Sequence, residues 1–252
     1  MRKQRAAGFS LVELMIALVL GLILVGSAAD VMISTKQTFQ TTDDLSRIQE
    51  NGRFALDVLV RDIRMAGYRP PGMGDLPHFF FVDDCGGVDP CTRDGGGNAS
   101  DRISVQYDPT NDLDCGGNPV GADDIIANVY EVLTVDNVNT LACRAWNVTT
   151  GAWVATAQPL IGGVDNLQLL YGLRSAANAS VYQYVSADQV GDWANVLSVR
   201  VGLLVNRGAQ FGQSDERTRS YVLLDTPPFS ETDRHNRRVY STTVTLVNAF
   251  NT

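Results

Sequence analysis

Residues 8–29 read GFSLVELMIALVLGLILVGSAA, and this stretch decides how the rest of the chain is arranged. Between residues 9 and 29, Glu13 is the only ionisable side chain. A helix of about 20 apolar residues is long enough to cross a bilayer. The preceding residues 1–8 carry Arg2, Lys3 and Arg5, and a basic flank favours the cytoplasmic side. The sequence therefore predicts a single membrane-spanning helix at 9–29, with the following residues on the outer side.

An ordinary secretory signal is the alternative interpretation of this stretch. Such a signal has a small-residue cleavage site after its apolar part, and residues 27–30 (SAAD) have that form. The alternative leaves Glu13 unexplained, because a charged side chain within a span costs about 2.5–3.5 kcal/mol on insertion scales and usually has a function. Glu13 also lies close enough to the cytoplasmic end to reach the lipid headgroups, and this simpler role stays open.

The helix is predicted to continue past the apolar stretch, as an amphipathic segment over residues 30–67. No proline or glycine cluster interrupts the chain before Gly67, which can cap a helix in the left-handed conformation, and Pro70 and Pro71 cannot continue it. Spacings of three and four predict one packing face, formed by Leu45, Ile48, Gly52, Leu56, Leu59, Ile63 and Ala66. This face can pack on the protein's own domain, the simpler interpretation, or on another subunit.

Residues 68–252 are predicted to form a β-rich domain, which makes the fold class α+β: a long N-terminal helix packed on a mainly antiparallel sheet. The part at about 70–124 is rich in Gly, Pro and Asp and predicts loops around one strand at 103–107. A capping-box sequence at 186–189 predicts a short helix that carries Trp193. Alternation of apolar and polar residues predicts further strands at 125–135, 139–145, 164–173, 197–205, 217–224 and 238–248.

The charge of the chain argues against nucleic acid as a partner. The formal net charge is -8, and residues 1–8 contribute +3, so residues 9–252 carry -11. An acidic surface repels phosphate backbones. The nearest candidate for a basic patch, Arg234, Arg237 and Arg238, is more simply explained as ion-pair partners or a solvated strand end.

An enzyme is the alternative from another class, and the sequence offers little support for it. The two histidines, His78 and His235, lie in no metal-ligand or catalytic-triad spacing. The glycine run at 95–97 lacks the lysine of a phosphate-binding loop. Many aspartates between residues 83 and 124 leave calcium binding open, although no stretch has the EF-hand pattern. We therefore expect no catalytic residues, no bound metal and no cofactor.

The four cysteines, Cys85, Cys91, Cys115 and Cys143, lie on the outer side of the membrane in this arrangement, where thiols oxidise to disulfides. Three pairings are formally possible. We predict Cys85–Cys91, which brackets a short turn, and Cys115–Cys143, which closes a longer loop. A zinc site is the competing use of these residues, but no C-x-x-C pair is present.

The residues GFSLVE at 8–13, between a basic leader and an apolar helix, resemble the processing motif of type IV prepilins. The resemblance implies that a prepilin peptidase cuts between Gly8 and Phe9 and methylates the new N-terminus at Phe9. It also implies that Glu13 pairs with the N-terminal amine of the adjacent subunit in a filament. The mature chain would then be anchored in the inner membrane with its domain in the periplasm.

Further motifs resemble the PilW-type minor pilins: RDIRMAGY at 61–68 preceded by QENGR at 49–53, GVDNLQ at 163–168, Trp193 before the strand at 196–205, and Arg238 with TVTLVN at 243–248. The resemblance implies a low-abundance subunit that primes pilus assembly at or near the tip of an extracellular pilus. Its partners would be the major pilin, other minor pilins and a large tip adhesin. At position 30, where major pilins commonly carry a proline, this chain has Asp30.

Two alternatives share the anchor. A J-type pseudopilin of a type II secretion system carries the same leader and a similar domain, and sequence separates it poorly from a minor pilin. A membrane-anchored binding module that never assembles would require neither the Gly8–Phe9 junction nor Glu13.

Overall fold

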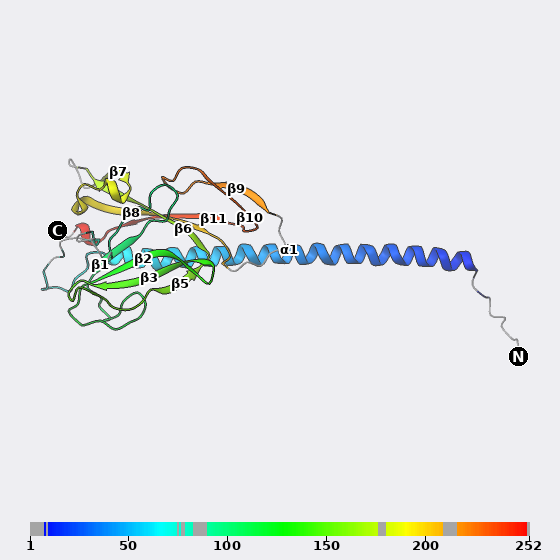
Figure 1. The fold of residues 1–252 in the computed structure, drawn as a ribbon, viewed down its shortest axis with the longest axis horizontal. Coiled ribbons are helices and arrows are strands. Elements are labelled where there is room, and N and C mark those ends of the chain that lie inside the picture. Colours follow the sequence, from blue (N-terminus) through cyan, green and yellow to red (C-terminus); the bar gives the residue numbers. More distant parts are fainter. Residues whose placement is uncertain are drawn as a thin grey trace. The chain divides into compact units, whose positions relative to one another are not determined.

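The computed structural model describes residues 8, 10–74, 76, 79–82, 90–175, 180–208 and 216–250. The chain divides into two compact units, Met1–Asp44 and Leu45–Thr252. One helix, α1 (Leu11–Met65), contributes to both units, and all described strands belong to the second (Figure 1).

Helix α1 has the extent that the sequence predicts, and it is long and apolar enough to cross a membrane. It ends where Gly67 adopts a positive φ of 75°, as expected for a left-handed cap. The Gly67 amide donates a hydrogen bond to the Gln106 carbonyl of a strand, at 2.8 Å. A side chain at position 67 would meet the ring of Phe79, so both the backbone conformation and the packing require glycine.

The buried face of α1 in the second unit differs from the prediction at three positions. Leu45 and Leu56 are only half-buried, and Ala55 is buried although the predicted face does not include it. The buried residues of the helix are Ile48, Gly52, Ala55, Leu59 and Ile63. Steps of 4, 3, 4 and 4 between the buried residues follow the helical period. They place Ala55 on the side of the helix that faces the sheets. Because this face joins the core of its own domain, the simpler interpretation of the stripe is confirmed.

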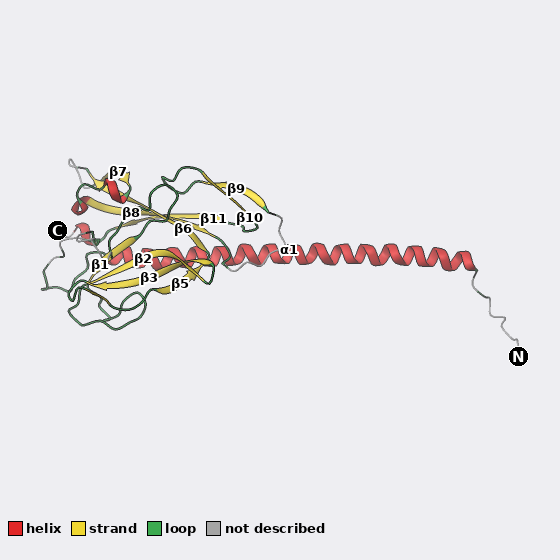
Figure 2. Cartoon of the chain, viewed as in Figure 1, coloured by secondary structure: helices red, strands yellow, loops and turns green. Residues whose placement is uncertain are grey.

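Two main sheets and a two-stranded ribbon contain the described strands of the second unit, and every strand pair is antiparallel (Figures 1 and 2). The first sheet has the order β1 (Ile103–Tyr107), β2 (Ile126–Val135), β3 (Val138–Asn147), β4 (Ala152–Trp153), with β5 (Gln158–Gly162) also paired to β3. The second has the order β11 (Arg238–Thr245), β8 (Val196–Val205), β6 (Val164–Arg174), β7 (Val181–Val185). The ribbon consists of β9 (Arg217–Tyr221) and β10 (Phe229–Asp233).

The α+β fold class is confirmed, with the strands distributed over two main sheets. Strands β4, β5, β7 and β10 are not in the prediction, because they are short or lack strict alternation; β5 contains Pro159 and pairs across a register shift. The predicted helix carrying Trp193 is wrong. Two separate 3-10 turns occupy the region, Ala187–Gln189 and Trp193–Asn195, and the Ser186 hydroxyl bonds to Asp188 instead of to the backbone.

A disulfide fixes the loop region to the first sheet. Cys115 is bonded to Cys143 of β3, with their Cα atoms 6.2 Å apart, which is the predicted pairing. The bond closes a segment of 28 residues, and a constraint of this length is worth about 3 kcal/mol or more in the entropic account of disulfide stabilisation. Cys91 is also disulfide-bonded, and its predicted partner Cys85 lies outside the described residues.

Gly52 allows the second sheet to pack closely on α1. A Cβ atom at position 52 would lie 2.4 Å from a ring carbon of Tyr240 on β11. We expect Gly52→Val to reduce the free energy of unfolding by about 2–3 kcal/mol, because the ring is rigid and overpacking of this kind is costly. Urea unfolding monitored by tryptophan fluorescence would measure the loss.

Two variants control this prediction. Gly26→Val introduces the same side chain on the same helix where nothing lies within 4 Å, and it should leave unfolding of the domain unchanged. Adding Tyr240→Ala to Gly52→Val should recover part of the loss. Equal stability of Gly52→Val and the parent protein would contradict the close packing.

Candidate functional site

The first turn of α1 contains a reciprocal pair of hydrogen bonds between Ser10 and Glu13. The Glu13 amide donates to Ser10 Oγ at 3.2 Å, and the Ser10 amide donates to Glu13 Oε2 at 3.4 Å. This arrangement is a capping box, which satisfies two of the amides left unpaired at a helix start. Glu13 therefore holds its carboxylate in the first turn, where the helix dipole favours a negative charge.

The structure thus gives Glu13 a partner within its own chain, in addition to the intersubunit partner that the resemblance implies. The signal for this cap was present, because serine followed three residues later by glutamate is the capping-box spacing. Gly8 and Ser10 are exposed on either side of Phe9, which lies outside the described residues. Proteolytic cleavage after Gly8 would leave Ser10 as the second residue and the helix beginning at the third.

Exposed apolar side chains surround the first half of α1. Every residue from 11 to 39 is exposed, and the large apolar ones among them are Leu11, Val12, Leu14, Met15, Ile16, Leu18, Val19, Leu20, Leu22, Ile23, Leu24, Val25, Val31, Met32, Ile33 and Phe39. A helix that is apolar on all sides is stable when lipid or other protein surrounds it. This surface is therefore suited to a bilayer or to the helices of other subunits.

The second half of α1 is joined to the first sheet by Asp62. The carboxylate accepts hydrogen bonds from Tyr130 Oη at 2.7 Å, Asn128 Nδ2 at 2.8 Å and Tyr107 Oη at 3.0 Å. Asn128 also donates to Tyr107 Oη at 2.8 Å, so the four side chains form one network. Burial raises the pKa of Asp62, and this effect outweighs the three hydrogen bonds, which lower it. Asp62 is not among the residues of the packing face predicted from the sequence, and this buried network is not predictable from the helical pattern.

A second carboxylate, Asp101, fixes the glycine-rich loop to the second sheet. Asp101 is 3% exposed and accepts hydrogen bonds from the amides of Gly95, at 2.9 Å, and Leu169, at 2.7 Å. Burial is the main cause that raises the pKa of Asp101, to about 7. The glycine run at 95–97 therefore belongs to a loop that Asp101 connects to β6 by hydrogen bonds.

Two models of known protein families match this chain, one in the β-rich domain and one at the N-terminus. The model of the type IV pilus-assembly protein W family, PilW, matches residues 129–248. The model of the prokaryotic N-terminal methylation motif matches residues 3–29, which contain Gly8, Phe9 and Glu13. The chain is a type IV pilin-like protein that carries a PilW domain over 129–248.

The type IV-like pilin TTHA1219 from Thermus thermophilus is 16% identical, with a TM-score of 0.45; the match covers 81% of this chain and 98% of that one. Among curated proteins, no sequence matches this chain significantly.

The PilW match includes a buried ion-pair network around Arg237. The guanidinium is 7% exposed and contacts Asp165 at 2.6 Å and Asp233 at 2.6 Å. The side-chain bond to Arg237 is the main cause that lowers the pKa of Asp233. Arg237 was considered as part of a basic patch, and the structure supports the alternative explanation, that it is an ion-pair partner.

The acidic loops of this protein are engaged with their own backbone. Asp114 accepts from the amides of Gly116 and Asn118, and Asp124 accepts from the amide of Gly121. Within the part of the chain that the structure describes, no group of three or more His, Cys, Asp or Glu side chains is arranged to hold a metal ion. His78 and three of the aspartates between residues 83 and 124 (Asp83, Asp84 and Asp89) lie outside the described residues.

Proposed function

We propose that this protein is a minor pilin that helps to prime the assembly of a type IV pilus and stays at or near its tip. The observation that carries the proposal is the presence, in one chain, of a PilW match over 129–248 and a methylation-motif match over 3–29. The domain boundaries that we propose are a leader at 1–8, a membrane span at 9–29, an amphipathic helical continuation at 30–67, and a β-rich domain at 68–252.

In the first proposed step, the protein is inserted in the inner membrane with its domain in the periplasm. A prepilin peptidase cuts between Gly8 and Phe9 and methylates Phe9. The N-terminal helix then leaves the bilayer and enters a filament, where its partners are the major pilin, other minor pilins and a tip adhesin. The exposed apolar surface of α1 supports this route, because the same surface is compatible with lipid and with neighbouring helices.

Glu13 has a defined part in this proposal. Its carboxylate pairs with the amine of Phe9 in the adjacent subunit, and the capping box keeps the carboxylate in the first turn before that amine arrives. The capping bonds are exposed and 3.2–3.4 Å long, so exchanging one of them for a charged amine is favourable.

The N-terminus of the mature protein tests the processing step. We expect protein extracted from membranes to begin at Phe9 and to carry one additional methyl group there, because the leader has been removed by the peptidase. Intact-mass and N-terminal peptide mass spectrometry would detect both changes. In cells that lack the peptidase, the same protein should retain Met1.

A mature chain that began at Met1 in cells with the peptidase, or after Ala29, would contradict the processing proposal. Copurification separates the minor pilin from the J-type pseudopilin. Immunolocalisation on sheared fibres, combined with crosslinking mass spectrometry, should find this protein beside pilus proteins at fibre ends, and finding it only beside secretion pseudopilins would contradict the proposal.

A further inference from the structure

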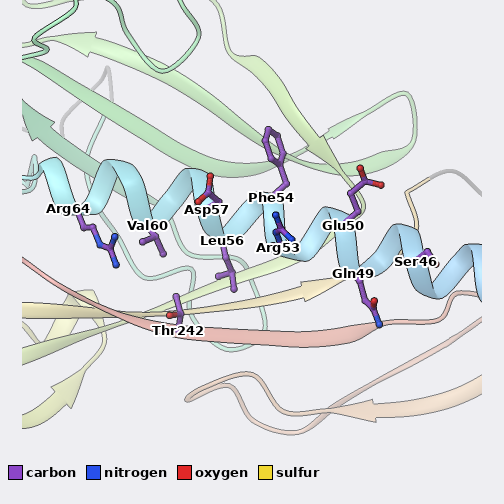
Figure 3. Close-up of a pocket in the computed structure, with 10 residues that line it drawn as sticks. All are labelled: Ser46, Gln49, Glu50, Arg53, Phe54, Leu56, Asp57, Val60, Arg64 and Thr242. Carbon is purple, nitrogen blue, oxygen red and sulfur yellow. The ribbon is translucent and has the colours of Figure 1, made fainter.

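A groove runs along the second half of α1 beside strand β11 (Figure 3). It has a volume of about 870 Å³ and is open to solvent. Ten residues line it: Ser46, Gln49, Glu50, Arg53, Phe54, Leu56, Asp57, Val60, Arg64 and Thr242. All of them lie in the second unit of the chain.

Strand β11 forms the edge of its sheet at this groove. It pairs with β8 over eight residues without a register shift, and among the described strands it pairs with no other. Just beyond the strand, the Leu246 amide donates to the Leu197 carbonyl at 2.9 Å. Backbone groups point alternately to the two sides of an antiparallel strand. Because Leu246 bonds toward β8, the even-numbered residues of β11 do the same. The odd-numbered residues direct their N–H and C=O groups away from β8, and these residues are Val239, Ser241, Thr243 and Thr245.

Within the described part of the chain, this edge lacks several of the features that usually prevent a strand from pairing with another chain. Natural edges are blunted by charged side chains, especially lysine, by proline, by a bulge, by very short length or by a covering helix or loop. β11 is eight residues long, contains neither lysine nor proline, and has no bulge against β8. Such an edge is a template for a further strand.

The floor of the groove indicates which side chains that strand would carry. Leu56 and Val60 extend from α1 toward β11, where Thr242 lies (Figure 3). Both are only half-buried, because the sheet ends at β11. A strand added to this edge would direct every second side chain toward them, so apolar residues at alternate positions would complete their burial.

The charges of the groove restrict the partner further. Asp57 is already paired with Arg61 at 2.7 Å, whereas Arg53 and Arg64 have no carboxylate partner in the described chain. Glu50 is the other unpaired charge, and Figure 3 shows it pointing away from β11. The unpaired charge along the groove is therefore positive on balance, although residues 9–252 carry -11 overall. A partner with carboxylates would match it.

We propose that β11 and this groove bind an extended strand of another polypeptide, which adds to the second sheet and lies against α1. The strand is about eight residues long, has apolar residues at every second position, and carries an acidic residue at each end. Main-chain hydrogen bonds to the open edge bind it, and Leu56 and Val60 select its side chains. The proposal depends neither on cleavage after Gly8 nor on Glu13.

A synthetic peptide tests the proposal directly. The probe is a labelled peptide of alternating threonine and valine with one glutamate at each end, titrated against the full chain in nanodiscs, with empty nanodiscs as the blank. We expect saturable binding. Thr243→Pro, which removes one outward amide, should weaken it at least tenfold, whereas Thr243→Val should not. A peptide N-methylated at alternate residues should not bind, and Arg53→Ala with Arg64→Ala should reduce both affinity and its salt dependence.

Amide hydrogen exchange of the full chain provides a second measurement in case Thr243→Pro perturbs the fold. Amides of the segment 239–245 should become protected when the threonine–valine peptide is added, while those of β7, the opposite edge, should not. Equal affinity for Thr243→Pro and Thr243→Val, or binding of the N-methylated peptide, would overturn the proposal. Protection that appears without peptide and rises with protein concentration would also overturn it, because it would identify a second copy of this chain as the occupant.

Discussion

Glu13→Ala is expected to leave the protein inserted and folded but to reduce its amount in pilus filaments at least tenfold. Removal of a charge from the apolar segment makes insertion easier, so a defect in assembly would come from the lost pairing with the neighbouring amine. Quantitative immunoblotting of sheared fibres against the membrane fraction would measure the effect. Wild-type amounts in the fibres would contradict the proposed role of Glu13.

The capping box offers matched controls for this experiment. Glu13→Gln retains a side chain that can complete a capping box but removes the charge. Ser10→Ala removes the cap and retains the charge, and loss of a cap costs about 1 kcal/mol. If assembly requires the charge of Glu13, the amount of Glu13→Gln in the fibres should be reduced like that of Glu13→Ala. Ser10→Ala should enter the fibres. The opposite pattern would assign the effect to the helix start.

Asp62→Ala is expected to destabilise the domain by about 3 kcal/mol or more. The substitution leaves Tyr107, Asn128 and Tyr130 without their common acceptor, and an unsatisfied buried polar group costs about 1–3 kcal/mol. Urea unfolding of the full chain would measure the change. Asp57→Ala, on the exposed side of the same helix, loses only an ion pair with Arg61 and should cost less than about 0.5 kcal/mol.

Asp62→Asn separates the hydrogen bonds of Asp62 from its charge. The amide can still accept from Tyr130 and donate to Tyr107, so the loss of stability should be smaller than for alanine. Burial raises the pKa of Asp62 above its unfolded value. The stability contributed by its protonated form is therefore present below about pH 3.9 and is lost as the pH rises through the folded pKa. Between pH 4 and pH 7, the free energy of unfolding should fall less in Asp62→Asn than in the parent protein; equal slopes would contradict this.

The sequence alone determined the features that depend on local order along the chain. An apolar run with one carboxylate predicts a membrane-competent helix, because the length of the run and the cost of charge in lipid are local properties. Gly67 followed by Pro70 and Pro71 predicts the end of α1, because backbone dihedrals restrict each residue separately. The pairing of Cys115 with Cys143 was also predicted, from compartment and loop length. The roles of Gly8, Phe9 and Glu13 remain predictions.

Only the tertiary structure decided which side chains meet across the sheets. Asp62 looks like a surface residue of a helix, and its function as an acceptor depends on three donors that lie 45–68 residues away in the sequence. Ala55 is buried in place of Leu56 because the orientation of α1 is set by contact with both sheets. Arg237 becomes a buried partner because β6 brings Asp165 beside it. Such contacts are made between distant segments, and their energies depend on a geometry that local patterns do not contain.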